Sequence, residues 1–569
     1  MNSNFFTHKT SCSPKTLVIL SLMIVFALSL PAKRALAASI TVNSTADTTI
    51  AGDTQCTLRE AVANANSDSD TTGGDCVAGS GTDTIGFTSA VLGQTITLSG
   101  SEITLSSNMT ISADVEGLII SGNNASRIFT VNSGSNVTLT NLRITDGNVT
   151  GNGGGIQNLG TLTINNSTID SNQATVVGGG VVNGVGASLT LNSTTLHSNV
   201  IASISGTNAG GGGLSNSGTA VLNNVTIHGN SASGGATSDN GGGIRNVSGA
   251  TITLNNVTVI NNTTERYGGG ISNAGGITLH NTILAYNLAG VQGPDCRGPV
   301  TINASLIRTT TNCTITNQGG SLLNVDPLLT SLDANGGGSV FHPALTAYPR
   351  DDSPVLNAGN NSTCLATDQR GNPRPVGNCD MGAVEKQAAE EVDHYCGTWV
   401  VGTPHVFGSN VNVTITPNTI SDTNACVTVV KRPVFPGLNQ NNGEFPIIWT
   451  VATAANANIT YNLDMDFCYT SAELTTSGVT DENTIVVYHH QNGSWQAQTT
   501  TPDPANNCVG VSGITSLSPW TIVGNGNAPT AIQLQNLTVR TAASPQGFAL
   551  VLVALLGLVA GVGLIRSRR

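Results

Sequence analysis

The sequence is poor in charged side chains. Only 9% of its 569 residues are Asp, Glu, Lys or Arg, and the formal net charge is −12 at pH 7. A surface that binds nucleic acid needs many Lys and Arg residues to neutralise phosphates, and this chain has 21 of them against 33 acidic residues. We therefore expect no nucleic-acid partner, and the acidic excess favours solubility.

Two further patterns are absent. No apolar stripe with a period of 3.6 residues runs through the Gly-, Asn-, Thr- and Ser-rich middle of the chain, which excludes a helical solenoid there. The cysteines have neither CxxC nor Cys/His spacing, which argues against zinc. We expect no cofactor and no metal site, with calcium left open.

The N-terminal residues have the pattern of a secretory signal peptide. Lys9 and Lys15 precede an apolar run over residues 17–30, and Ala35-Leu36-Ala37 supplies small residues at a cleavage site before Ala38. This order of basic, apolar and small residues is typical of a signal peptide. A true N-terminal anchor is the alternative, but the run is shorter than the ~20 residues that a membrane span needs. We predict that residues 1–37 are removed on export.

The C-terminal residues predict a membrane span. Residues 547–565 contain no charge, and the basic tail 566–569 follows directly. Nineteen residues span about 28 Å as a helix at ~1.5 Å per residue, which matches the hydrocarbon core. The positive-inside rule places the tail in the cytoplasm. Neither LPxTG nor Pro-Glu-Pro precedes the run, so retention is favoured over a sorting tail that is later removed, and we expect the bulk of the protein to lie at the cell surface.

After the signal peptide the chain contains ten cysteines, an even number. In an exported chain an even number indicates disulfides formed in an oxidising compartment. Spacing alone leaves the connectivity open, but the cysteines fall into five couples that are local in the sequence: Cys56 with Cys76, Cys296 with Cys313, Cys364 with Cys379, Cys396 with Cys426, and Cys468 with Cys508.

The middle of the chain repeats every 25 to 33 residues. Three glycines and an apolar residue recur, beginning at Gly153, Gly178, Gly211, Gly241 and Gly268. Two asparagines recur in each copy, the first as Asn158, Asn183, Asn216, Asn246 and Asn273, and the second as Asn172, Asn199, Asn230, Asn262 and Asn287. Repeats of this length cannot bury a face alone and must stack.

Aligned copies give apolar columns separated by Thr, Ser and Asn. One column is Ile164, Leu191, Leu222, Leu254 and Leu279, and another is Ile169, Leu196, Ile227, Val259 and Leu284. Alternation with period two is typical of half-buried strands. We predict an all-β fold in which residues 38–386 form a right-handed parallel β-helix, with a tandem of β-sandwiches as the alternative.

Local motifs add detail to this solenoid. We expect the recurring asparagines to lie at inward corners, to adopt the left-handed conformation and to hydrogen-bond to their equivalents in neighbouring turns. We expect the glycines to allow turns that side chains would block. Thr57-Leu58-Arg59-Glu60 is a capping box, which predicts a short helix through Ala65 that closes the N-terminal end.

The region 387–525 differs in composition and contains all four tryptophans. Its short strand-like runs separated by turns predict a β-sandwich. A polar linker, 526–546, then leads to the predicted span.

Two motifs and the repeats carry a family resemblance. Cys56-Thr57-Leu58-Arg59-Glu60-Ala61 resembles the CSLREA motif of bacterial surface β-helix proteins. The segments 326–328, 353–359, 368–375 and 379–385 are similar to a choice-of-anchor Q region, and the Gly-Gly-Gly repeats are similar to those of polymorphic outer membrane proteins and pectate-lyase-like folds. The resemblance covers about residues 40–386 and implies a right-handed parallel β-helix on a cell surface. Thr57 and Met381 depart mildly from the pattern, and no catalytic residue is carried over.

One aligned column contains side chains that can do chemistry. Asp170, His197 and His228 occupy equivalent positions, so we expect them to stack on one outer face, about 5 Å apart. A metal or acid–base site is one interpretation. The other is a solvent-facing column of variable type, which the next members, Ile260 and Ala285, favour.

A second candidate is a charged group before the domain boundary: Asp368, Arg370, Arg374, Asp380 and Glu385. It contains enough carboxylates for an active site. Bidentate Arg–carboxylate pairs that tie the C-terminal end of the solenoid together are the alternative, which its position beside two cysteines favours.

These observations favour a surface-anchored, adhesin-like binding protein without catalysis. The partner would be an extracellular glycan or another cell-surface ligand, because solenoids present long faces to extended partners. A membrane-anchored polysaccharide lyase or glycoside hydrolase is the alternative. Such chemistry needs paired carboxylates, or acidic residues for calcium together with a basic residue. Charged residues are sparse between Gly151 and Gly290. The sequence leaves the oligomeric state open.

Overall fold

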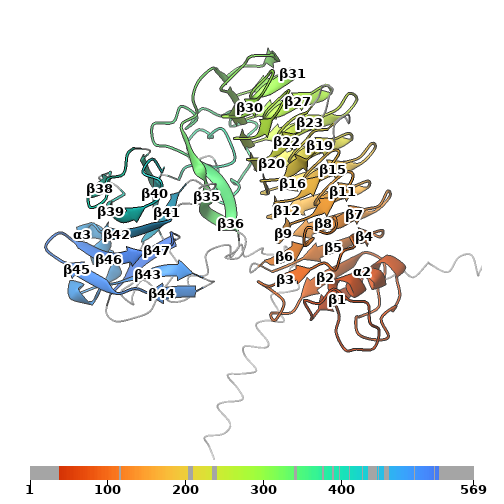
Figure 1. The fold of residues 1–569 in the computed structure, drawn as a ribbon, viewed down its shortest axis with the longest axis horizontal. Helices are drawn as coiled ribbons and strands as arrows, with labels where there is room; N and C mark the ends of the chain where they lie inside the picture. The colour runs from red at the N-terminus through yellow and green to blue at the C-terminus, as the bar shows by residue number, and fades with distance from the viewer. Residues whose placement is uncertain are drawn as a thin grey trace, which may run out of the picture. The chain divides into compact units, whose positions relative to one another are not determined.

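A computed structural model gives the fold (Figure 1). It describes residues 37–114, 117–202, 209–233, 240–338, 343–374, 377–387, 390–395, 397–408, 411–425, 427–433, 445, 447–453, 460–491, 494–517 and 519–524.

The N-terminal two thirds of the described chain is a parallel β-helix, as the repeats predict. Every strand pairing within it is parallel, and each strand pairs with its equivalent one turn away, for example β12 (Thr161–Asn165) with β16 (Ser188–Asn192). Figure 1 shows the turns stacked from β1 to β31. Three sheets run along the stack.

The first sheet has two strands in most turns. Its members, besides β12 and β16, are β1 (Ser39–Val42), β2 (Asp83–Phe87), β4 (Ile103–Leu105), β5 (Met109–Ser112), β7 (Phe129–Val131), β8 (Asn136–Thr140), β11 (Ile156–Asn158), β15 (Val181–Asn183), β19 (Leu214–Asn216), β20 (Thr219–Asn223), β23 (Ile244–Asn246), β24 (Thr251–Asn255), β27 (Ile271–Asn273), β28 (Gly276–His280), β31 (Cys296–Asn303) and β33 (Cys313–Asn317).

The second and third sheets have one strand per turn. The second contains β3 (Thr95–Thr97), β6 (Leu118–Ser121), β9 (Leu142–Thr145), β13 (Thr168–Asp170), β17 (Thr195–His197), β21 (Thr226–His228), β25 (Thr258–Ile260), β29 (Ile283–Ala285), β32 (Leu306–Ile307) and β34 (Leu322–Leu323). The third contains β10 (Asn148–Val149), β14 (Gln173–Ala174), β18 (Val200–Ala202), β22 (Ser231–Ser233), β26 (Thr263–Thr264) and β30 (Leu288–Ala289).

The strand register confirms the apolar columns. Ile164 pairs with Leu191, and Ile169 pairs with Leu196, in the order that the sequence alignment predicts. All four side chains are buried in one continuous core. Stacking places apolar residues of one turn beside apolar residues of the next, so each turn buries the apolar face of its neighbour.

The recurring asparagines form buried ladders that run through the turns. Asn199 Nδ2 donates to Asn230 Oδ1 over 2.9 Å, and Asn230 Nδ2 donates to Asn262 Oδ1 over 2.9 Å. The ladder ends at Asp295, whose Oδ1 accepts from Asn287 Nδ2 over 2.9 Å. These amides are almost completely buried, so each bond satisfies groups that water cannot reach.

The expected left-handed conformation of these asparagines is wrong. Positive φ values occur instead at the residues just before one ladder, such as Ser198 and Asn261, and at a separate corner that includes Asn224 and Asn256. A ladder side chain must point inward from extended backbone, so the neighbouring residue makes the turn.

The glycine triplets behave as the sequence predicts. Gly211 has a φ of +71°, in the left-handed region that favours glycine. A Cβ atom on Gly212 would lie 2.4 Å from the Gly242 carbonyl oxygen. Glycine is thus required both for the turn and for the close approach of successive turns.

A helix, α2 (Leu58–Ser67), begins at the predicted capping box, with Thr57 as N-cap and Glu60 as its reciprocal partner. Its apolar residues join the core of the first turns, and it contacts β1, β2 and β4. Arg59 bonds to Asp47 and to the carbonyl oxygens of Ser101 and Glu102. The predicted N-terminal cap is confirmed.

Beyond β34 the chain leaves the stack and forms a hairpin, β35 (Leu329–Gly338) with β36 (Pro343–Pro349). We name residues 343–387 the strap, of which 375 and 376 lie outside the described residues. Its contacts are with the outer side of the second sheet, from Thr195 to Leu306. The strap therefore lies along the side of several turns, whereas the sequence placed its charged group at the end of the solenoid.

After the strap, two antiparallel sheets enclose a separate core that contains Trp449, Trp520 and Phe467, where the sequence predicts a β-sandwich. One sheet is β37 (Glu391–Tyr395), β40 (Val427–Pro433), β41 (Ile447–Thr453), β47 (Pro519–Val523), β43 (Val486–Gln491) and β44 (Ser494–Ala497). The other is β38 (His405–Phe407), β39 (Val413–Ile420), β42 (Tyr461–Cys468), β46 (Cys508–Ile514) and β45 (Thr500–Asp503), and α3 (Ser471–Ser477) and η1 (Glu482–Thr484) complete the region.

Four of the local cysteine couples are disulfides: Cys56–Cys76, Cys296–Cys313, Cys364–Cys379 and Cys468–Cys508. Cys396 and Cys426 lie outside the described residues, as do 1–36 and 525–569, which hold nearly all of the predicted signal peptide, the linker and the predicted span. Within the part of the chain that the structure describes, no helix is long and apolar enough to cross a membrane.

Candidate functional site

The column of Asp170, His197 and His228 is assembled by the second sheet. The register pairs Asp170 with His197 and His197 with His228, and Ile260 follows. The expectation that this column faces solvent is wrong, because Asp170 is 0% exposed and His228 is 5% exposed. The later members of the column are apolar because the strap covers this side of the sheet. Ile260 packs in a small cluster that includes strap residues.

Asp170 is held by an ion pair within the solenoid. Arg143 Nε and Nη2 donate to its two carboxylate oxygens over 2.8 and 2.7 Å. Thr145 Oγ1 and Ser171 Oγ also donate to the carboxylate. Burial would raise the pKa of Asp170, but these hydrogen bonds outweigh it and the pKa lies below its usual value. The carboxylate is ionised and engaged, which suits a structural anchor.

The two histidines are held neutral. Burial lowers the pKa of His197 despite the nearby charge of Asp170, and burial lowers the pKa of His228 to about 4. Asn261 Nδ2 lies 3.2 Å from His228 Nε2 and, as an amide donor, makes this nitrogen the acceptor. Among the described residues no group of three or more His, Cys, Asp or Glu side chains is placed to hold a metal ion.

The outward threonines of the second sheet bind the strap. Gln369 Nε2 donates to Thr195 Oγ1 over 2.7 Å, while Gln369 Oε1 accepts from Thr226 Oγ1 over 2.6 Å. Thr258 Oγ1 accepts from the backbone N–H of Ala383 over 2.9 Å. The Gln369 side chain thus joins two turns, and Thr195, Thr226 and Thr258 all bond to the strap.

The first half of the predicted charged group forms a buried clamp. Arg370 Nε donates to Asp368 Oδ2 over 2.8 Å, and Arg370 Nη1 donates to Glu390 Oε1 over 2.8 Å. The Arg370 guanidinium lies 5.0 Å above the centre of the Tyr348 ring, and the Tyr348 hydroxyl bonds to Glu390. Burial opposes the charge, but the two carboxylates raise the pKa of Arg370 above its usual value. Sequence reasoning missed Glu390 because it lies beyond the predicted boundary at residue 386.

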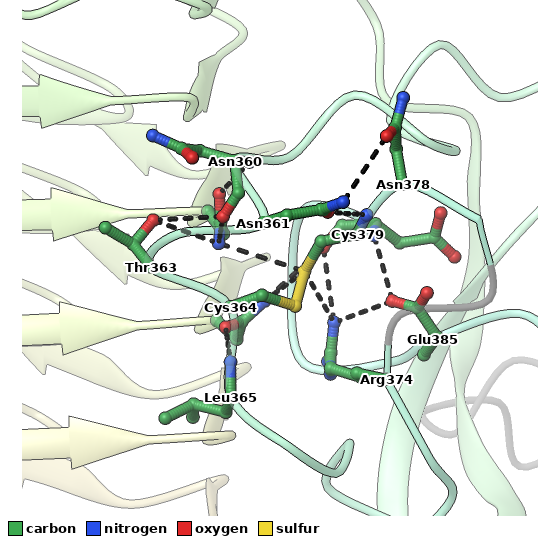
Figure 2. The surroundings of a disulfide bond; sticks show 12 residues. Asn360, Asn361, Thr363, Cys364, Leu365, Arg374, Asn378, Cys379 and Glu385 are labelled. Atoms are coloured by element: carbon green, nitrogen blue, oxygen red, sulfur yellow. Dashed lines mark hydrogen bonds and ion pairs between the residues drawn. A yellow bond between two sulfur atoms is a disulfide. The ribbon is translucent and has the colours of Figure 1, made fainter.

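The second half lies beside a disulfide (Figure 2). Arg374 Nη1 donates to Glu385 Oε2 over 3.1 Å, and both side chains are completely buried. Figure 2 shows Arg374 between Glu385 and the Cys364–Cys379 disulfide. Asp380 accepts from the backbone N–H groups of Asn357 and Lys386. Burial, then repulsion by Glu385, raises the pKa of Asp380 to about 6.

The charged side chains of both groups that the sequence singled out are therefore engaged in ion pairs and hydrogen bonds within the protein. The structure does not join the two into one site: the Asp170 column is engaged by Arg143, and the Asp368–Glu385 group is engaged within the strap and by Glu390. Breaking a buried pair leaves an uncompensated charge, so these groups are suited to fixing the strap on the solenoid.

The polar columns of the repeats form an open face on the first sheet, which the sequence alone did not assign to particular strands. Six strands, β8, β12, β16, β20, β24 and β28, share one burial pattern in which residues one, three and five point outward. We name these outward residues the open face: Asn136, Thr138, Thr140, Thr161, Thr163, Asn165, Ser188, Thr190, Asn192, Thr219, Val221, Asn223, Thr251, Thr253, Asn255, Gly276, Thr278 and His280. The polar columns beside the apolar ones were the available signal.

The open face is ordered and carries no Asp, Glu, Lys or Arg. Asn255 Nδ2 donates to Asn223 Oδ1 over 2.8 Å, and Asn223 Nδ2 donates to Asn192 Oδ1 over 2.9 Å. Threonine is restricted at χ1 because it is β-branched. The face is therefore a rigid array of hydroxyl and amide groups that repeats at about 4.8 Å along the stack.

Comparison with known proteins adds one finding. No family model matches the chain, and no curated protein matches it. Among solved structures, the crystal structure of pectate lyase Pel9A is similar, with a TM-score of 0.38 and 14% identity over 62% of this chain and 98% of that chain. The assignment of a parallel β-helix rests on the strand register described above.

Proposed function

We propose that this protein is an exported, surface-held binding protein whose solenoid holds an extended glycan on the open face. The observation that carries the proposal is the repetition of one outward pattern over six consecutive strands. A polymer with its own repeat can make equivalent contacts with successive turns, and elongated solenoid faces suit such partners.

The chemistry of the face supports a sugar as the partner. Hydroxyl and amide groups both donate and accept hydrogen bonds, as sugar hydroxyls do. Asn192 and Asn223 are already fixed by their ladder, so little side-chain entropy is lost when a ligand binds.

A role without catalysis is supported by the use of the charged residues. Glycoside hydrolysis needs two carboxylates that flank one bond. Asp170 is paired with Arg143, and Asp368 and Glu385 are paired with Arg370 and Arg374. These carboxylates are buried and engaged rather than presented to a substrate.

Surface location is part of the proposal. The signal peptide and the apolar tail of the sequence support export and anchoring. The four disulfides among the described residues fit an oxidising compartment.

Incubation of the full-length protein with a panel of polysaccharides tests both roles. The protein would be produced in an oxidising compartment and purified in detergent, and calcium would be present or absent. We expect retention on at least one immobilised glycan, without unsaturated products or new reducing ends. Turnover of any polysaccharide would overturn the proposal and support a lyase or hydrolase.

Substitutions on the open face test the location. Thr190→Arg with Thr253→Arg places two bulky cations on outward positions of the middle column and should weaken binding about tenfold or more, because each blocks contact over neighbouring turns. Thr97→Arg is the matched control, because Thr97 is exposed on the second sheet. Equal binding by both variants would exclude the open face.

A further inference from the structure

Asp83, the first residue of β2, has a carboxylate that the described part of the chain leaves incompletely satisfied. Its side chain is completely buried. Its Oδ1 accepts from the backbone N–H of Ser80 over 2.9 Å and from that of Ala38 over 3.1 Å. Its Oδ2 is buried and accepts no hydrogen bond, and Asp83 belongs to no ion pair among the described residues. Because a buried carboxylate is costly without a positive partner, this one lacks a positive charge and at least one donor.

The group that faces this carboxylate is the backbone nitrogen of Ala38. In the uncut chain this nitrogen is an amide with one hydrogen, which is shared between Asp83 Oδ1 at 3.1 Å and the Ser80 carbonyl oxygen at 3.2 Å. With Asp83 Oδ2, the two residues offer three acceptor atoms for one hydrogen. An ammonium group, which has three hydrogens and a positive charge, matches these acceptors better than an amide does.

Ala38 is also the residue that the sequence places first after the signal peptide. The small residues Ala35 and Ala37 predict hydrolysis of the bond between Ala37 and Ala38. Hydrolysis by a signal peptidase adds one water molecule, so that Ala37 gains a carboxyl group and Ala38 gains an α-amino group. The proton released by the carboxyl group is taken up by the amino group, which is largely an ammonium at pH 7 because its pKa is about 8.

The strand register holds the Ala38 nitrogen beside Asp83. β1 pairs with β2 along its whole length, and the Thr84 N–H donates to the Ala38 carbonyl oxygen over 2.8 Å. The inward side chain of Ile40 on β1 is completely buried in the core of the first turns. Ala37 is exposed, so the new terminus would form at the outer end of a strand that is already fixed.

We propose that Asp83 is the binding site for the α-ammonium group of the mature N-terminus at Ala38. This inference rests on the export that is part of the proposed function, because export supplies the peptidase. Removal of residues 1–37 replaces one shared amide hydrogen bond by a buried ion pair with charge-assisted bonds, which are stronger than bonds between neutral groups. The first turn, where β1 and β2 contact the capping helix α2 (Figure 1), is therefore completed only in the processed protein.

The first test measures access to the new terminus. The full chain is produced in an exporting host with an oxidising compartment and purified in detergent, and N-terminal sequencing should begin at Ala38. Acetylation with an N-hydroxysuccinimide ester, followed by mass spectrometry of the N-terminal peptide, gives the reaction rate of the α-amino group. We expect the folded protein to react about tenfold or more slowly than the protein unfolded in guanidinium chloride, because the ion pair withholds the nitrogen lone pair.

A substitution of Asp83 tests its charge. Asp83→Asn keeps the shape of the side chain and removes the negative charge, so the folded variant should be acetylated about tenfold faster than the wild type and should unfold at a lower temperature. Asp68→Asn is the matched control. Asp68 Oδ1 accepts from the backbone N–H of Gly81 over 2.8 Å, next to the residue that Asp83 contacts, but the N-terminus does not depend on it. Its acetylation rate should equal that of the wild type.

An uncut form separates the ion pair from a general structural role of Asp83. Ala37→Tyr places a bulky residue where the peptidase needs a small one, so the chain keeps its amide at Ala38, which N-terminal sequencing verifies. In this background Asp83→Asn should lower the unfolding temperature less than it does in the processed protein. Equal losses in the two backgrounds would overturn the ammonium site.

The outcomes separate this inference from the function on which it rests. A processed protein that begins at another residue, or a folded Asp83→Asn variant that reacts at the wild-type rate, would overturn the ammonium site and leave export and the open face standing. A protein that keeps residues 1–37 in the exporting host would overturn both the site and the cleavable signal peptide. The comparison of folded with unfolded wild type needs no variant, so equal rates there would overturn the site even if Asp83→Asn does not fold.

Discussion

At the scale of single residues, burial decides the chemistry of the column that contains Asp170 and His228. An aspartate and two histidines in register would make a metal or acid–base site on an exposed face. Because the column is buried, Asp170 remains charged through its ion pair with Arg143. His228 stays neutral, with a pKa of about 4. The same residue types therefore act as packing and anchoring groups here.

Replacing His228 by isoleucine should reduce the acid sensitivity of the fold. His228 has a folded pKa below its ordinary 6.5, so the unfolded chain binds more protons between pH 6.5 and 4, and stability is lost as the pH falls through this range. At ~1.36 kcal/mol per pKa unit the loss is about 3 kcal/mol. We expect this part of the loss to disappear in His228→Ile, as measured by urea unfolding at pH 7 and pH 4.5.

The pH dependence of the wild-type protein alone does not isolate the His228 contribution, because Asp380 contributes with the opposite sign. Its folded pKa of about 6 lies above the ordinary 3.8, so the folded state binds more protons between pH 4 and 6 and gains stability as the pH falls. The two groups oppose each other in the wild type. His280→Asn is the comparison: burial also lowers the pKa of half-buried His280, but less than that of His228, so this variant should remove a smaller part of the loss. The preceding residue in its column is Asn255. Identical pH dependence in His228→Ile and wild type would contradict the assignment.

At the scale of elements, the solenoid uses asparagine ladders in two environments. The ladder through Asn199, Asn230 and Asn262 is buried, and each amide bonds to the next turn and to a backbone carbonyl. The ladder through Asn192, Asn223 and Asn255 lies on the open face within reach of water. Identical side-chain bonds should therefore differ in their contribution to stability.

We predict that Asn230→Ala destabilises the protein by about 3 kcal/mol or more, because it leaves several buried donors and acceptors unsatisfied at about 1–3 kcal/mol each. Asn223→Ala should cost less than about 1 kcal/mol, since water replaces the lost partner. Chemical unfolding of both variants measures the difference. Similar losses would show that the inner ladder is not held by the bonds described.

At the scale of the whole molecule, the strap joins segments that are far apart in the sequence. Gln369 bonds to Thr195 and Thr226, and the strap residue Met381 packs with Ile260 and Ile283. The clamp around Arg370 then connects the strap to Glu390. The Cys364–Cys379 disulfide closes a 15-residue separation within it.

Replacing both Cys364 and Cys379 by serine should loosen the strap and leave the solenoid formed. A disulfide that closes a loop of this length contributes about 3 kcal/mol by constraining the unfolded chain. Hydrogen exchange should accelerate at the Gln369 N–H, which donates to the Ala383 carbonyl within the strap, and at the Ala383 N–H, which donates to Thr258 of the solenoid. Exchange in β5, which lies several turns before Thr195, is the internal control, and equal protection of the strap in both forms would contradict its dependence on the disulfide.

The sequence by itself determined the repeating part of this protein. Gly211, Asn230 and Leu222 recur at equivalent positions, and stacking with near-identical register follows because each turn can bury its face only against another copy. The capping box at Thr57 is equally local, since its two reciprocal bonds involve residues three apart. Period and local chemistry suffice for such features.

Only the tertiary structure decided what covers each face. His228 and Thr190 both occupy outward strand positions, but the strap buries one and the other lies on the open face. On the strand of His228, Thr226 bonds to Gln369 of the strap, more than 140 positions away. The strap is in turn tied to Glu390, which lies beyond the predicted boundary.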